Sequence, residues 1–172
     1  TLAVVSSLTL ALFLIFSPSE TNDIEKSFDL AKGTVLDLSQ NSNSYDGASP
    51  IAIGDSIMLG AARQLANAGF VVDAAINRDF SAGYAILDQL KKLDKIPSLV
   101  VVDLTSNTEV SMQSLIGFMD AFSTDSKIAI VRGWVPLMPY HAGNRKNLDE
   151  LMVRYPDLII VEWMNIAREN KQ

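Results

Sequence analysis

The feature that most constrains the fold of this chain is a regular alternation of short β-branched runs with amphipathic stretches, which begins at Ile51. Some runs, such as Leu99–Leu104, are almost continuously apolar. Such runs are typical of parallel strands that are covered on both faces. Right-handed crossovers between such strands place helices on both faces of the sheet. The sequence therefore predicts an α/β fold, a three-layer α/β/α sandwich around a parallel sheet.

The bounds of the predicted elements follow from this periodicity and from two prolines. Pro97 and Pro156 stand just before β-branched runs, where they would end the preceding helices. The strands are expected at Ile51–Gly54, Val71–Ile76, Leu99–Leu104, Lys127–Arg132 and Leu158–Trp163. The helices are expected at Ile57–Ala68, Ala82–Leu93, Ser111–Phe122 and Asn144–Arg154.

Composition excludes several classes of function. The formal net charge is −6 and the pI is near 4.7, without a stripe rich in Lys or Arg, so we expect no nucleic-acid partner. The absence of cysteine excludes disulfides, thiolate zinc sites and cysteine nucleophiles. The sequence shows neither a carboxylate cluster with metal-ligand spacing nor a glycine-rich phosphate loop. We therefore expect no metal and no cofactor.

The N-terminal part of the chain differs from the rest in composition. Residues 1–17 are nearly all apolar and are predicted to be a transmembrane segment, incomplete because a spanning helix needs about 20 residues. The alternatives are a signal-peptide core, although no basic region precedes the run, and a buried soluble helix. Residues 18–50 are rich in serine and acidic residues and are predicted to be a polar linker. Residues 51–172 are then the globular domain.

Gly54, Asp55 and Ser56 come directly after the first predicted strand and ahead of a helix. In an open parallel sheet, ligands bind outside the carboxyl ends of the strands. A serine at such a turn has its hydroxyl over the sheet edge and its backbone N–H at the positive end of the helix. This arrangement suits a nucleophile whose own amide holds an oxyanion. The alternative is that Asp55 or Ser56 only caps the helix.

The segment Ile51-Ala-Ile-Gly-Asp-Ser-Ile-Met-Leu-Gly60 resembles the first block of the SGNH hydrolases, in the version fused to membrane acyltransferase family 3 domains. Nearly all of residues 51–170 resembles this family, less specifically after the first block. The resemblance implies an SGNH/flavodoxin-like fold and O-acetylation of peptidoglycan or another cell-surface polysaccharide. The later blocks are Val72–Arg78, Val100–Asn107, Ile130–Pro136, Asn144–Leu148 and Leu158–Trp163.

The resemblance also implies roles for individual residues. Ser56 would be the nucleophile, and Gly54 and Asp55 would support its turn. The N–H of Ser56, the side-chain amide of Asn107 and the N–H of Asn77 would form the oxyanion hole. For Asn107, a plain turn residue after a strand is the alternative.

The chain departs from the family at two glycine positions. Asn77 replaces one of them, and asparagine tolerates unusual backbone angles better than most residues. Thr105 replaces the other and is expected to disturb the loop that presents Asn107.

The general base is less clear than the nucleophile. The family closes with Asp-x-x-His, and no such motif occurs before Gln172, so we expect this block downstream and the chain truncated at both ends. His141, the single histidine, is the weaker candidate base, in a predicted loop after the fourth strand; otherwise it is a solvated or substrate-facing residue. Arg78 either contacts an anionic or glycan substrate or forms a surface salt bridge. Trp134 and Tyr140 either stack on a sugar ring or belong to the core.

The resemblance as a whole implies a serine-dependent O-acyltransferase of the cell membrane with an extracytoplasmic globular domain. Its partners would be a glycan acceptor, an acyl donor and the upstream acyltransferase-3 membrane domain. The acyl group would pass through Ser56 to a sugar hydroxyl, or to water in an acetylesterase. The alternative is a non-catalytic SGNH-fold domain for glycan binding or scaffolding, because Asn77, Thr105 and the missing histidine block depart from the family. A flavodoxin-like nucleotide-binding module is a third, weaker hypothesis.

Overall fold

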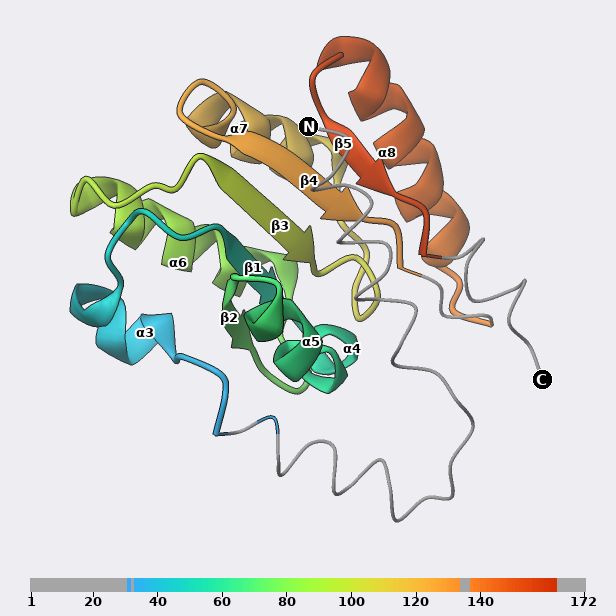
Figure 1. Cartoon of the computed structure of the whole chain (residues 1–172). Coiled ribbons are helices and arrows are strands. Elements are labelled where there is room, and N and C mark those ends of the chain that lie inside the picture. The colour runs from blue at the N-terminus through green and yellow to red at the C-terminus, as the bar shows by residue number, and fades with distance from the viewer. Residues whose placement is uncertain (1–30, 32, 134–136, 164–172) are drawn as a thin grey trace, which may run out of the picture.

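The core of the molecule is a five-stranded parallel sheet (Figure 1). The computed structural model describes residues 31, 33–133 and 137–163. The strand order is β2-β1-β3-β4-β5, which is the order of flavodoxin-like folds. The predicted α/β fold with a parallel sheet is therefore confirmed. The strands are β1 (Ile51–Gly54), β2 (Val71–Ala74), β3 (Leu99–Asp103), β4 (Lys127–Val131) and β5 (Ile159–Val161).

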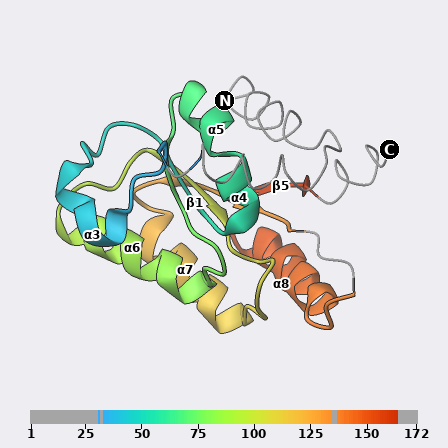
Figure 2. The same cartoon turned by 90° about the horizontal axis from the view of Figure 1, so that it is seen from below.

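Helices cover both faces of this sheet (Figure 2). One face carries α6 (Phe80–Lys92), α7 (Met112–Phe122) and α8 (His141–Arg154), together with α3 (Leu38–Asn41) and the 3-10 helix η1 (Ser42–Ser44). The opposite face carries α4 (Ser56–Gly60) and α5 (Ala62–Asn67). Each face buries its own apolar cluster, because successive residues of a strand point to opposite sides of the sheet.

The helix starts are set by capping side chains, and this explains where the predicted bounds differ. Asp79 accepts a hydrogen bond from the N–H of Ala82 at 2.9 Å, so α6 begins at Phe80, two residues earlier than predicted. The single helix predicted at Ile57–Ala68 is instead two short helices that meet at Ala61. The first of them ends at Gly60, and glycine is a poor residue for a helix interior.

The end of the predicted linker is part of the domain, so the linker prediction is wrong for this part. The N–H of Leu36 donates to the carbonyl of Val72 at 2.9 Å, and the N–H of Leu38 donates to Oδ2 of Asp73 at 3.0 Å. The side chains of Leu38 and Tyr45 are buried in the cluster beneath α6 and α7. Residues 18–30 and 32 lie outside the described residues.

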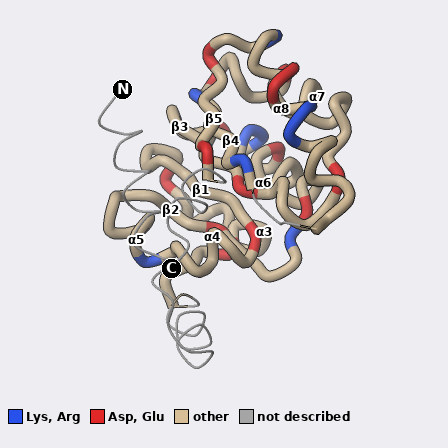
Figure 3. Tube along the Cα trace, turned by 90° about the vertical axis from the view of Figure 1, so that its right-hand side faces the viewer, with Lys and Arg blue, Asp and Glu red and all other residues tan. Residues whose placement is uncertain are grey.

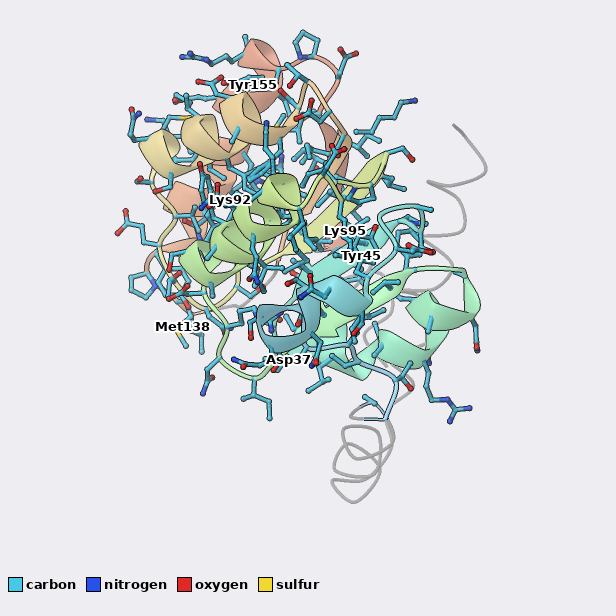
Figure 4. All side chains as sticks on the ribbon, turned by 90° about the vertical axis from the view of Figure 1, so that its left-hand side faces the viewer. Asp37, Tyr45, Lys92, Lys95, Met138 and Tyr155 are labelled. Atoms are coloured by element: carbon cyan, nitrogen blue, oxygen red, sulfur yellow. The ribbon has the colours of Figure 1, made fainter. Side chains whose placement is uncertain are left out.

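A lysine holds the η1 segment against the domain from outside. The ammonium of Lys95 donates to the carbonyl of Asn43 at 2.8 Å; Lys95 and Tyr45 are both labelled in Figure 4. The hydroxyl of Tyr45 donates to the carbonyl of Ser49. The segment therefore joins β1 through packed and hydrogen-bonded residues.

The predicted membrane segment, residues 1–17, lies outside the described residues. Within the ranges that the structure describes, we find no helix long and apolar enough to span a bilayer.

Charges of both signs are interspersed along the described chain, and α8 carries both (Figure 3). The exposed ion pairs include Lys92–Asp88 at 2.6 Å and Lys146–Glu150 at 3.7 Å. Pairs of this kind contribute about 0–1 kcal/mol each, so the two apolar clusters dominate the stability of the domain.

We predict that Leu38→Ala destabilises the domain by about 2–5 kcal/mol, because it leaves a cavity in a buried cluster. The free energy of unfolding can be measured by urea denaturation. Gln40→Ala, which truncates an exposed side chain of the same helix, is the control and should have almost no effect. A similarly small effect for Leu38→Ala would show that the segment behaves as a linker.

Candidate active site

The candidate site lies where the order of strands reverses, between β1 and β3. Ligands of open α/β sheets bind outside the carboxyl ends of the strands at this position. Ser56 follows β1 and Asn107 follows β3, so both reach the same edge of the sheet.

The turn that carries Ser56 is closely packed and capped. A Cβ at Gly54 would lie 2.3 Å from the Cβ of Met58, so only glycine lets α4 pack this closely on the end of β1. The carboxylate of Asp55 accepts the N–H of Ile57 at 2.8 Å and caps α4. Ser56 is the first helical residue, and the N–H of such a residue has no acceptor within its helix.

The side chain of Ser56 is half-buried, and its hydroxyl has no hydrogen-bond partner among the described residues. Ser56 thus lies at the first position of α4, at the carboxyl edge of the sheet. The capping alternative is therefore observed for Asp55. The role of Ser56 as nucleophile stays a prediction.

The side chain of Asn107 reaches the serine turn from β3. Its amide nitrogen donates to Oδ2 of Asp55 at 3.1 Å and to the carbonyl of Arg78 at 3.3 Å. The structure therefore joins Asn107 to Asp55, the residue that precedes Ser56. In this arrangement both N–H groups of the amide are already used.

Arg78 belongs to a buried ion pair, so the predicted surface salt bridge is corrected. Its guanidinium donates to Oδ1 of Asp73 at 2.6 Å and to the carbonyl of Asp73 at 2.7 Å. The two side chains are only 10% and 1% exposed. Burial raises the pKa of Asp73, and the charge of Arg78 lowers it in part. Arg78 thus fixes the β2–α6 connection, and its carbonyl is one of the acceptors that hold Asn107.

Asn77 has a left-handed backbone conformation, which glycine adopts readily and which asparagine also tolerates. Its φ is 60°, in the left-handed region that asparagine tolerates. The N–H of Arg78 donates to the carbonyl of Ala75 at 3.3 Å and closes a turn around Asn77. Asn77 is exposed at the same edge of the sheet as Ser56.

Thr105 stabilises the loop after β3, contrary to the expectation that it disturbs it. Its hydroxyl donates to the carbonyl of Val131 at 3.1 Å and accepts the N–H of Gly133 at 3.2 Å. These bonds join the loop to the end of β4. The threonine is thus compatible with the presentation of Asn107.

Asn144 is a positioning residue that sequence reasoning missed. Its buried side chain accepts the N–H of Val110 at 2.8 Å and donates to the carbonyls of Thr105 at 2.9 Å and Thr108 at 2.8 Å. Tyr140 adds a bond from its hydroxyl to the carbonyl of Ser106 at 2.9 Å. The signal in the sequence is that Asn144 falls on the same helix row as buried Leu148 and Leu151, where an unpaired polar side chain would be costly.

His141 lies in the first turn of α8, whereas the sequence predicts a loop there. Its side chain is half-buried, and its imidazole makes no hydrogen bond with the rest of the described chain. The structure does not join it to Ser56. Trp134 lies outside the described residues.

Asp103, at the end of β3, is a second residue that sequence reasoning missed. Its carboxyl group is fully buried, and neither oxygen has a hydrogen-bond partner in the described structure. In the sheet it pairs with Gly54, and its carbonyl accepts the N–H of Asp55 at 3.1 Å. The signal is a single charged residue in an otherwise apolar run.

The neighbouring carboxyl groups of Asp103 and Asp55 differ in the hydrogen-bond donors that the protein provides for them. Burial raises the pKa of Asp103 well above its usual range, and the charge of Asp55 raises it further. Burial also raises the pKa of Asp55, but the N–H groups of Ile57 and Met58 lower it. Asp55 is therefore the member of the pair that carries the charge, and Asp103 remains a neutral acid.

Metal ligands do not gather at this edge. In the described ranges, no group of three or more His, Asp or Glu side chains is placed to hold a metal ion.

Comparison with known proteins supports the fold. No protein-family model and no curated protein sequence matches the chain. Among solved structures, it is similar to the C-terminal catalytic domain of Streptococcus pneumoniae peptidoglycan O-acetyltransferase A (OatA), solved with a methylsulfonyl adduct. The TM-score is 0.60 at 20% sequence identity, and the match covers 73% of each chain. The fold that the sequence resemblance implies is thus confirmed.

We predict that Asp103→Asn makes stability less dependent on pH. In the parent, the unfolded chain loses the Asp103 proton near pH 4, while the folded chain keeps it until its raised pKa is reached. The contribution of Asp103 is therefore full below about pH 4 and is lost as the pH rises through the raised pKa. Because asparagine does not titrate, the stability of the variant minus that of the parent should grow as the pH rises from about 4 through the raised pKa of Asp103.

Urea denaturation at several pH values measures this difference. Asp94→Asn, at an exposed position whose positive φ asparagine also tolerates, is the matched control and should follow the parent. Parallel profiles for Asp103→Asn and the parent would show that the buried carboxyl group does not titrate differently on folding.

Proposed function

We propose that this chain is the catalytic domain of an extracytoplasmic serine O-acyltransferase that acetylates a cell-wall or surface glycan, with Ser56 as the nucleophile. The observation that carries the proposal is the position of Ser56. It begins α4 beyond the end of β1, at the strand-order reversal, with Asn107 beside it. The likeness of the fold to the OatA catalytic domain supports the same reading.

In the proposed reaction, the Ser56 oxygen attacks the carbonyl carbon of the acyl donor while a base takes the serine proton. The tetrahedral intermediate then expels the donor's alcohol or thiol, which regains a proton, and an acyl-serine ester remains. A sugar hydroxyl next attacks this ester, gives its proton to the same base and releases free Ser56. Water in place of the sugar would make the enzyme an acetylesterase.

The oxyanion would be held by backbone and side-chain N–H groups at the sheet edge. The N–H of Ser56 is free of an acceptor in its helix, and it lies at the positive end of α4. Asn107 would supply a second donor by turning its amide from Asp55 toward the oxyanion, and the N–H of Asn77 a third. Such donors are typically worth about 3–4 kcal/mol each in the transition state.

The base would be the histidine of a downstream Asp-x-x-His segment, with His141 as the second candidate. The acyl donor would reach Ser56 through an upstream acyltransferase-3 membrane domain, and the acceptor would be a peptidoglycan-type glycan. These assignments place the domain on the outer side of the cell membrane.

A non-catalytic glycan-binding domain is the second candidate function, and one observation favours it. Both N–H groups of Asn107 are engaged by Asp55 and Arg78, so the amide is held as a structural link. Under this hypothesis the Ser56 hydroxyl has no chemical role.

We predict that Ser56→Ala lowers acetyl transfer by about 10³-fold or more, in a chain extended through an Asp-x-x-His segment, because no acyl-serine can form. The assay supplies an activated acetyl ester and a chitin oligosaccharide. Mass spectrometry then separates acetylated sugar from free acetate, and so transferase from esterase.

Ser98→Ala is the matched control, because Ser98 is exposed just before β3, at the opposite edge of the sheet. It should retain the activity of the parent. Undiminished turnover by Ser56→Ala would reject Ser56 as the nucleophile, and no turnover by the extended parent would favour the non-catalytic domain.

A further inference from the structure

A cavity of about 600 Å³ lies beside the candidate active site, between the first turns of α6 and α7. This volume is within the range of about 300–1,000 Å³ that is typical of small-molecule sites. Its walls combine aromatic and aliphatic side chains with polar groups from the helix starts. The mechanism proposed above leaves this cavity unused.

The inner wall of the cavity is apolar and held in place. Phe80, Tyr84 and Val110 contribute to it. The ring of Tyr84 packs edge-on against Phe118 and Phe122, with centroids 6.2 and 5.4 Å away. Gly117 adds no side chain, and nothing lies within 4 Å of the point where its Cβ would be. A flat apolar group such as a sugar face therefore has an aromatic surface to pack on.

Two carboxylates contribute to the polar part of the wall, Asp79 and Glu109. Oδ1 of Asp79 accepts the N–H of Ala82 and the hydroxyl of Ser81, and these bonds lower the pKa of Asp79. Asp79 forms no ion pair with a basic side chain of the described chain. Glu109 is exposed, and it too has no hydrogen-bond or ion-pair partner among the described residues.

No lysine or arginine is among the described residues that line the cavity. The nearby guanidinium of Arg78 is used by Asp73. No basic side chain of the described cavity wall therefore pairs with either carboxylate, and backbone and hydroxyl donors offset only part of the charge of Asp79. The remaining negative charge favours a cationic ligand.

The cavity is linked directly to the residues of the candidate site. The side chain of Asn107 is bonded to the carbonyl of Arg78. The next residue along each segment, Thr108 and Asp79, lines the cavity. Consecutive Cα atoms are about 3.8 Å apart, so the cavity begins one residue away from the hydrogen bond between Asn107 and Arg78.

We propose that this cavity is an acceptor subsite for a primary ammonium group carried by the glycan, an assignment that rests on the proposed function. The body of the ligand would pack on Tyr84, and its ammonium would lie between Asp79 and Glu109. The two sources of such a group are a de-N-acetylated amino sugar and the amine of a peptide attached to the glycan. The same chemistry recognises both.

Binding to the 172-residue chain carrying Ser56→Ala tests the proposal without turnover. The sugar probes are a glucosamine pentamer and its fully N-acetylated form. The peptide probes are a short lysine-ending peptide and its Nε-acetylated form. Calorimetry at about pH 6, where primary amines are protonated, gives the Kd values. Amide NMR shifts of Tyr84 and Gly117 locate the ligand.

In one of the two probe pairs, the form with the free amine should bind at least tenfold more tightly than the acetylated form. Whether the sugar pair or the peptide pair shows this preference identifies the source of the amine. Asp79→Asn keeps a residue that caps α6 but removes the charge, and Glu109→Gln removes the other. Each should weaken amine binding by about twofold to fivefold, and the double variant should abolish the preference. Gly117→Phe, whose side chain enters the cavity, should abolish binding with the domain folded.

Glu150→Gln removes an equal charge from α8, outside the cavity, and is the matched control; it should bind as the parent does. Equal affinity for free and acetylated probes would overturn the proposal, and so would a preference that survives in the double variant. These outcomes are independent of Ser56 chemistry, so they separate failure of the subsite from failure of the proposed function.

Discussion

The carboxylate of Asp55 is the group on which the candidate site depends. It caps α4 through the N–H of Ile57 and accepts the amide of Asn107, so it joins the end of β1 to the loop after β3. From Asn107 the hydrogen bonds continue to the carbonyl of Arg78, and the guanidinium of Arg78 holds Asp73. One connected network thus sets the position of the turn that carries Ser56. Its members come from three neighbouring strands, β2, β1 and β3, so the network forms only when the sheet does.

The free-energy cost of burying a carboxylate at this edge of the sheet differs between Asp73, Asp55 and Asp103. Asp73 is offset by an arginine, Asp55 by backbone and amide donors, and Asp103 by neither. An isolated carboxylate in an apolar site is so unfavourable that the group keeps its proton instead. The neutral acid of Asp103 therefore leaves Asp55 as the charged partner of the helix and of Asn107. Protein cores tolerate such groups mainly where a site requires them, which is consistent with a functional edge here.

The strands could be predicted within a few residues because a parallel sheet covered on both faces imposes nearly continuous β-branched runs. The position of Ser56 followed from the same pattern, since it is local to β1 and α4. Leu38 and Tyr45 could not be placed in this way, because the polar residues around them indicate a linker and their burial depends on distant α6 and α7. The bonds of Asn144 depend in the same way on long-range contacts with a loop about 35 residues away in the sequence. Local pattern predicts elements, whereas the polar groups that fix one element against another require the assembled fold.

The proposed role of Ser56 as a nucleophile can be tested by covalent capture of its hydroxyl. The OatA catalytic domain was solved with a methylsulfonyl adduct, so a methylsulfonyl fluoride is a suitable reagent. The chain, extended through an Asp-x-x-His segment, would be treated with it, digested and mapped by mass spectrometry. If Ser56 is the nucleophile, one modified peptide is expected, with the methylsulfonyl group on Ser56 and none on the other serines. An unmodified Ser56, or label spread over several exposed serines at similar rates, would contradict it.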